Sequence, residues 1–197
     1  MGRSLPIRRM TPLPLPQPVL LPVLSLLALG CATAPQPLPA HASREVVIGY
    51  DDNHPQDTIA FPTSTYESVT RFELPVGEHH PLRLRLQAGA LGALAITIYD
   101  STPLEAPGEP ILTLTRSLDS ADVSNGKDGR WVVEELAEAK PLSGVVWIGV
   151  RKTAGEPTVW ASGASTGQSY IRNNDPQNLM GLLPTKHGPM LRLEVAP

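Results

Sequence analysis

A short loop near the start of the folded region carries several oxygen donors that could hold a cation. Asp51, Asp52 and Asn53 are consecutive, and Asp57 follows within the same polar stretch. Calcium takes roughly six to eight oxygen ligands, and carboxylate and amide side chains supply them in loops of this kind. The spacing is not that of an EF-hand, and a solvated turn uses the same residue types. The sequence therefore predicts either a calcium site or a polar turn at these four residues.

Two other stretches contain metal-ligand residue types. Residues 122–128 hold further acidic side chains, but Lys127 stands where an EF-hand loop starting at Asp122 would need glycine. His79 and His80 precede an alternating strand, in which adjacent residues point to opposite faces. We therefore expect a solvated turn in the acidic stretch, and an exposed turn rather than a shared metal at the two histidines.

Aromatic residues in the last third of the chain point to another chemistry, the stacking of sugar rings. Trp160 and Tyr170 flank a loop of small residues, whereas Trp147 lies in an apolar run and is expected in the core. Polar side chains follow directly, at Arg172, Asn173, Asn174 and Asp175. Aromatic faces beside polar groups are typical of carbohydrate sites. The sequence predicts a ligand site at these six residues, with packing of the two aromatic rings as the alternative.

Residues 163–167, GASTG, resemble the nucleophile elbow of α/β-hydrolases. Asp175 and His187 follow Ser165 in the chain order of that family, Ser, acid and His. The elbow needs a strand that turns into a helix, but residues 168–172 read as a strand. The short intervals also leave no room for the elements that normally carry the partners. We therefore expect a turn between strands here, and no enzyme.

The composition favours strands in the region that carries these residues. The sequence has 22 prolines, 16 glycines and 18% charged residues, which suits a turn-rich all-β domain. Leu82, Leu84 and Leu86 share one face of a predicted strand, and Arg83 and Arg85 share the other. We expect strands at residues 45–50, 68–74, 81–86, 94–99, 111–116, 130–136, 145–150, 158–161, 168–172 and 190–195.

About ten short strands at spacings near ten residues predict a two-sheet antiparallel β-sandwich over residues 44–197, with jelly-roll or Greek-key connections. Residues 145–161 read as a hairpin, and residues 134–140 as one short helical turn. The runs ITIYDSTPLEAPGEPILTLT, VVWIGVR and QSYIRN resemble jelly-roll modules appended to secreted bacterial proteins. That resemblance implies an accessory or binding role.

The N-terminus reads as a secretory signal. Arg3, Arg8 and Arg9 precede an apolar run at residues 19–31, and no acidic residue occurs before Glu45. A membrane span needs roughly 20 apolar residues, and this run is shorter. Export of the protein is therefore expected.

Residues 27–31, LALGC, end at the single cysteine of the chain and resemble the lipobox of bacterial lipoproteins. The resemblance implies a signal peptide at residues 1–30 and a lipid on Cys31. By the sorting rule of that family, Ala32 implies the outer membrane. Residues 31–43 are rich in proline and alanine, which predicts an extended tether. An ordinary cleaved signal is the alternative, and it implies a secreted or periplasmic protein.

Loss of the signal peptide would remove three arginines and no acid from a chain of formal charge −3. Nucleic acid is not an expected partner, because its recognition needs a basic patch. Calcium is the only cofactor that the sequence suggests. The sequence predicts an envelope-anchored lipoprotein with a non-catalytic β domain, acting in binding or as a structural component. Its expected partners are the membrane, through the lipid, and an envelope protein or polysaccharide. A carbohydrate-binding module is the first alternative and a serine hydrolase the second.

Overall fold

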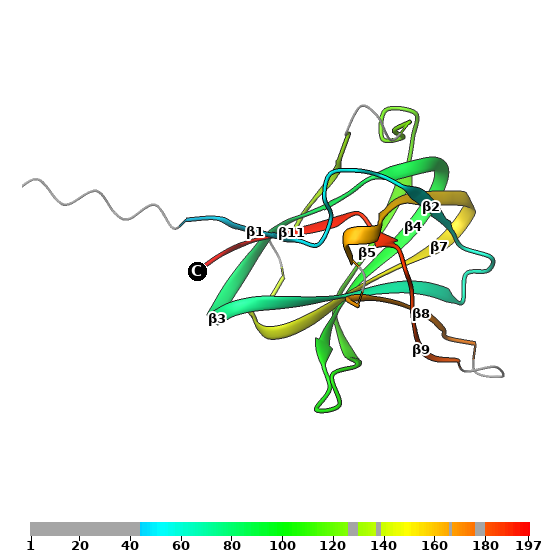
Figure 1. The fold of residues 1–197 in the computed structure, drawn as a ribbon. Helices are drawn as coiled ribbons and strands as arrows, with labels where there is room; N and C mark the ends of the chain where they lie inside the picture. Colours follow the sequence, from blue (N-terminus) through cyan, green and yellow to red (C-terminus); the bar gives the residue numbers. More distant parts are fainter. Residues whose placement is uncertain (1–43, 126–129, 137–138, 166, 176–179) are drawn as a thin grey trace, which may run out of the picture. The chain divides into compact units, whose positions relative to one another are not determined.

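Antiparallel β-strands make up most of the computed structural model (Figure 1), which describes residues 44–125, 130–136, 139–165, 167–175 and 180–197. The chain divides into two units, Met1–Ala40 and His41–Pro197, and every described residue belongs to the second. The elements are β1 (Val46–Gly49), β2 (Asp57–Ala60), β3 (Tyr66–Leu86), β4 (Ala88–Ser101), β5 (Pro107–Leu118), β6 (Val132–Glu135), β7 (Leu142–Ser162), the 3-10 turn η1 (Gly163–Ser165), β8 (Ser169–Asn173), β9 (Met180–Pro184), β10 (Gly188–Pro189) and β11 (Leu191–Ala196). No helix among these residues is long and apolar enough to span a bilayer.

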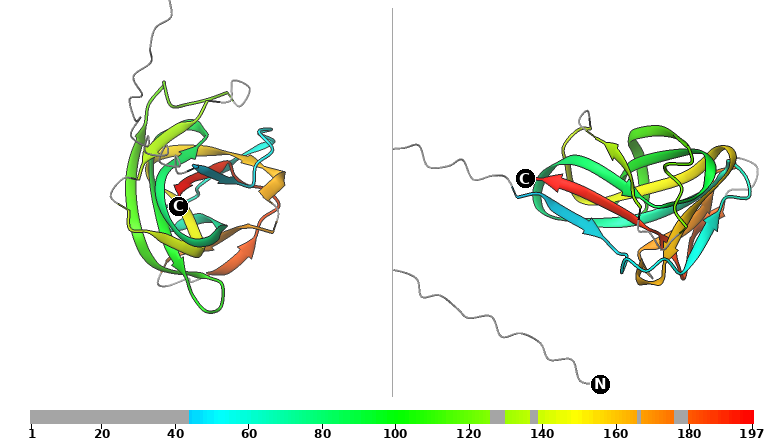
Figure 2. Two further views of the ribbon diagram at one scale, coloured as in Figure 1. Left: turned by 90° about the vertical axis from the view of Figure 1, so that its left-hand side faces the viewer. Right: turned by 90° about the horizontal axis from the view of Figure 1, so that it is seen from above.

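The strands form one open, hydrogen-bonded sheet with 11 members. Its main order is β1-β11-β3-β7-β4-β5, with β6 and β8 paired to β3, β2 and β10 paired to β7, and β9 paired to β8. The pairings between these named strands are antiparallel. Seen end-on, the strands curve around one interior (Figure 2). The all-β prediction is confirmed at this level.

The two longest strands of the sheet are β3 and β7, each of 21 residues, and both of them bend. The first half of β3 pairs with β7 and β8, and its second half pairs with β11 and β6. The register of β3 against β7 shifts between Glu73 and Glu78, where Gly77 has φ 121°. The segments predicted at 68–74 and 81–86 are therefore parts of one strand.

The hairpin predicted at residues 145–161 is wrong. β7 runs through the whole segment, because both of its halves pair with the same strand, β4. Gly155 accommodates the bend with φ 68°, a conformation open to glycine. The helical turn predicted at residues 134–140 is also not observed at its start, since Glu134 and Glu135 belong to β6.

The interior of the curved sheet is apolar. Leu84 and Leu86 are fully buried there, as their alternation with arginines predicts. The same cluster takes in Phe72 from the first half of β3 and Ile96 and Ile148 from β4 and β7. A second, smaller cluster contains Val69, Tyr99 and Trp147. Because neighbours along a strand point to opposite faces, this second cluster lies on the outer face of β3, β4 and β7.

Candidate functional site

The register of β8 against β3 places two predicted ligand residues on this outer face. Tyr170 lies opposite Val69, and Arg172 lies opposite Glu67. Directly opposed residues of an antiparallel pair share a face. β8 therefore carries its aromatic ring and its guanidinium toward the small outer cluster.

Glu67 is the centre of the contacts that Arg172 makes. Its side chain is fully buried, and its Oε2 accepts hydrogen bonds from Arg172 Nε at 2.8 Å and from Asn174 Nδ2 at 3.0 Å. Arg172 Nη2 lies 2.7 Å from the same oxygen. Tyr99 donates its hydroxyl to Oε1 at 2.8 Å. A buried carboxylate is tolerated when it is paired and hydrogen-bonded in this way.

The sheet below Glu67 has a gap that only glycine leaves open. A Cβ at Gly149 would overlap the Glu67 carboxylate and lie 2.9 Å from Tyr99 Cε2. Burial, followed by the neighbouring Glu67 charge, raises the pKa of Tyr99, so its hydroxyl stays a donor. The guanidinium carbon of Arg172 lies 4.7 Å from the centre of the Tyr99 ring, in a cation–π arrangement. The Glu67 carboxylate and the Tyr99 ring thus both pack against the backbone of β7 at Gly149.

Tyr170 belongs to the neighbouring aromatic pair. Its ring centre is 5.6 Å from that of Trp147, with the planes at 56°, and its hydroxyl donates to Gly167 O at 3.2 Å. Trp147 is buried, as predicted for a core residue. Trp160 has different neighbours: it pairs with Thr58 of β2, and its Nε1 donates to Ser124 O at 3.0 Å.

The predicted ligand site is therefore divided. Tyr170, Arg172 and Asn174 belong to the outer cluster around Glu67, whereas Trp160 lies beside Thr58 and Ser124. Asn173 is buried, and its Oδ1 accepts a hydrogen bond from the backbone N of Asp175 at 3.0 Å.

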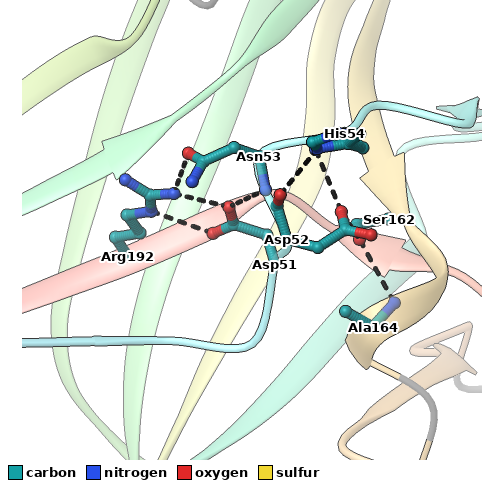
Figure 3. Close-up of polar contacts among 7 residues, drawn as sticks. All are labelled: Asp51, Asp52, Asn53, His54, Ser162, Ala164 and Arg192. Carbon is teal, nitrogen blue, oxygen red and sulfur yellow. Dashed lines mark hydrogen bonds and ion pairs between the residues drawn. The ribbon is translucent and has the colours of Figure 1, made fainter.

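The loop predicted to bind calcium is held by an arginine (Figure 3). Arg192 of β11 contacts Asp51 through Nε at 3.0 Å and Nη2 at 2.6 Å, and its Nη2 also contacts Asn53 Oδ1. Its guanidinium carbon lies 4.3 Å from the centre of the Trp131 ring. Asn53 adopts φ 61°, which asparagine tolerates better than most residues. A guanidinium thus supplies the positive charge opposite Asp51.

The other two predicted calcium ligands make separate contacts. Asp52 Oδ1 accepts hydrogen bonds from the His54 backbone N and from Ser162 Oγ, both at 2.9 Å. These two bonds lower the pKa of Asp52, the one from His54 being the larger cause. Asp57 accepts from the Thr58 backbone N at 2.8 Å. Within the described ranges, no three His, Cys, Asp or Glu side chains are grouped as metal ligands, and calcium binding stays a prediction.

The remaining metal-ligand stretches have structural contacts of their own. Asp122 Oδ1 lies 2.8 Å from Arg116 Nη2, while residues 126–128 fall outside the described part of the chain. His79 is buried within β3, and its Nε2 lies 3.1 Å from Pro75 O, so the exposed turn predicted there is wrong for this residue.

The acid and the histidine of the hydrolase pattern lie at opposite ends of β8. His187 Nδ1 is 3.9 Å from Asp57 Oδ2, and the nearby Thr185 N donates to Ser169 O at the start of β8. Asp175 lies two residues beyond Asn173, the last residue of that strand, and a strand rises about 3.3 Å per residue. The backbone of Ser165 belongs to η1, between the strands β7 and β8. The sheet therefore does not bring Asp175 to His187.

The sequence pattern did not identify Glu67 and Tyr99, which lie at the centre of the outer cluster. It also did not identify Arg192, which holds the loop at Asp51. One signal was available for Glu67, because alternation places it on the same face as Val69, an apolar neighbour. The proposed lipidation residue, Cys31, lies outside the described residues. No protein family, curated protein or solved structure matches the chain.

Proposed function

We propose that this chain is an envelope-anchored lipoprotein whose β domain acts by binding or as a structural component, without catalysis. The anchor rests on the basic start, the apolar run and the LALGC sequence that ends at Cys31. A lipid on Cys31 and an outer-membrane location are parts of the same proposal.

One observation carries the non-catalytic part. Glu67, the most buried acid of the outer cluster, receives hydrogen bonds from Arg172, Asn174 and Tyr99 and is covered by them. A general acid or base must reach the substrate proton, which a carboxylate enclosed by three donors cannot do without breaking those contacts. The cluster is better suited to hold β8 against β3 and to present a fixed surface.

The two-layer arrangement also belongs to the proposal. Core residues from the two halves of β3, Phe72 and Leu84, belong to one apolar cluster. Bends at Gly77 and Gly155 divide the long strands near their middles. Both features support a β-sandwich in which bent strands pass from one layer to the other, with jelly-roll or Greek-key connections.

Fractionation of the native host tests the anchor. The wild-type protein should pellet with outer membranes, and a Cys31→Ser variant should not. An equal distribution of the two proteins in the soluble or secreted fraction would overturn the proposal.

Carbohydrate is the second candidate ligand, because Tyr170 and Arg172 are partly exposed on one face beside Asn174. Affinity electrophoresis against neutral and acidic polysaccharides tests it. Retardation that Tyr170→Ala abolishes and Trp160→Phe preserves would support a sugar site, since Trp160 contacts different neighbours. Migration unchanged by every polysaccharide would leave an envelope protein as the expected partner.

A further inference from the structure

Among the described residues, two large apolar side chains are far more exposed to solvent than the others. Val76 is 106% exposed and Leu104 is 90% exposed. The next most exposed large apolar side chain, Leu91, is 56% exposed. Single exposed apolar residues are common, so the position of these two in the fold decides whether they matter.

Both residues lie in segments that leave the same end of the sheet. β3 and β4 flank β7 and are both antiparallel to it, so they run in the same direction. Val76 lies in the bulge that follows Glu73 of β3, and Leu104 lies in the turn that follows β4. Arg71 links the two segments, with Nη1 3.3 Å from Glu73 Oε2 and Nη2 3.6 Å from Glu105 Oε2.

The N-terminal strand begins at this end as well. Val46 of β1 pairs with Val195 of β11, and Val195 pairs with Pro81 of β3, a few residues beyond Val76. Glu45, just before β1, lies 2.9 Å from Arg83 through Oε2 and Nη2. In Figure 1 the start of β1, the C-terminus and the corner of β3 lie together on the left. Any tether that precedes β1 is therefore joined to the domain at the end where β3 bends.

The proposed tether is short enough to keep this end near a membrane. The 13 residues from 31 to 43 can reach at most about 47 Å, because a chain spans no more than about 3.6 Å per residue. A short tether raises the effective concentration of the attached domain at the surface to about the millimolar range. Contacts too weak to recruit a free protein are then sufficient to orient a tethered one.

We infer that this end of the β domain rests on the lipid bilayer that carries its anchor, with Val76 and Leu104 inserted among the lipids. This inference depends on the lipid anchor of the proposed function. Glu73, Glu105 and Arg71 at the same end carry mixed charge, so the apolar side chains, rather than an attraction to anionic lipid, provide the contact. Docking should therefore be insensitive to salt.

A tryptophan reporter tests the contact on the mature, lipid-modified protein in vesicles of phosphatidylethanolamine and phosphatidylglycerol. Leu104→Trp places an indole at the proposed contact. Leu91→Trp is the matched control, because it lies at the opposite end of the same strand, β4. With brominated lipids, the Leu104→Trp protein should lose at least twice the fluorescence that the Leu91→Trp protein loses, after subtraction of the wild-type signal.

Adding Val76→Asp to the Leu104→Trp protein should reduce its quenching, and raising the salt concentration should not. Equal quenching of the two reporters, or quenching that salt abolishes, overturns the docking and leaves the anchor standing. A mature chain whose intact mass shows no lipid overturns the proposed function, and the docking falls with it.

Discussion

Glu67 and Arg172 form an ion pair across β3 and β8, with Arg172 Nη2 2.7 Å from Glu67 Oε2. The carboxylate is fully buried, whereas 18% of the arginine side chain is exposed. β8 is five residues long and pairs with β3 over its whole length, so this ion pair adds a buried side-chain link to the backbone pairing.

Arg172→Ala should destabilise the domain by about 3 kcal/mol, because it leaves the buried charge of Glu67 without its cation. Urea unfolding followed by tryptophan fluorescence measures the change. Glu156→Gln is the control: it removes the ion pair with Lys152, but the side chain of Glu156 is 84% exposed, and such surface pairs contribute about 0–1 kcal/mol. Equal losses in the two variants would show that the buried pair has no special role.

Gly149→Ala should destabilise the domain by about 1–3 kcal/mol, since the added methyl group displaces the Glu67 carboxylate and the Tyr99 ring. Thermal unfolding is the measurement. A methyl group at Gly181 in β9 meets nothing within 4 Å, so Gly181→Ala should change the melting temperature little. An unchanged melting temperature for Gly149→Ala would mean that the carboxylate does not occupy the gap above β7.

Asp52 should make the stability depend on pH in the acidic range. The His54 backbone N and then the Ser162 hydroxyl hold the pKa of Asp52 below its ordinary value of 3.8. A carboxyl group with a lowered pKa stabilises the fold above its ordinary pKa, and this contribution disappears as the pH falls through the folded-state value. Melting temperatures of the wild type should therefore fall more steeply below about pH 4 than those of Asp52→Asn. Parallel curves for the wild type and Asp52→Asn would contradict the prediction.

Glu134 should lower the stability of the fold as the pH rises, which is the opposite of the effect of Asp52. Burial raises its pKa above the ordinary value of 4.5, and Arg116, 3.3 Å away from Nε to Oε1, only partly opposes the rise. A raised pKa favours the folded state below the ordinary value, and the contribution is lost as the pH rises through the folded-state pKa. The stability of Glu134→Gln relative to wild type should therefore increase as the pH rises from about 4.5 to 7. A constant difference from wild type across that range would count against a raised pKa.

Alternation was a reliable guide to strands in this sequence. Leu84 and Leu86 are buried where the period of two places them, and the strand predicted at 111–116 lies within β5. Continuity was not predictable in the same way. Gly155 looks like the centre of a hairpin turn, but pairing of β4 along both halves of β7 keeps that strand continuous. The continuity of β7 thus depends on pairing with β4, which is distant in the sequence and cannot be seen in the local pattern.

The two ion pairs at the polar sites, Glu67 with Arg172 and Asp51 with Arg192, also join residues that are far apart in the sequence. Glu67 and Arg172 are 105 residues apart, and Asp51 and Arg192 are 141 apart. Charged residues on the polar side of a strand are normally read as solvated. Only the register of the sheet shows that Glu67 is covered by Arg172, and that Arg192 reaches the loop whose acids suggested calcium.

Intact mass of the mature protein from its native host is the most direct test of the lipid anchor. The mature chain should begin at Cys31 and carry the additional mass of attached lipid, and Cys31→Ser should never acquire that mass. An unmodified mature chain that begins elsewhere would contradict the anchor and make a secreted or periplasmic binding domain the better account.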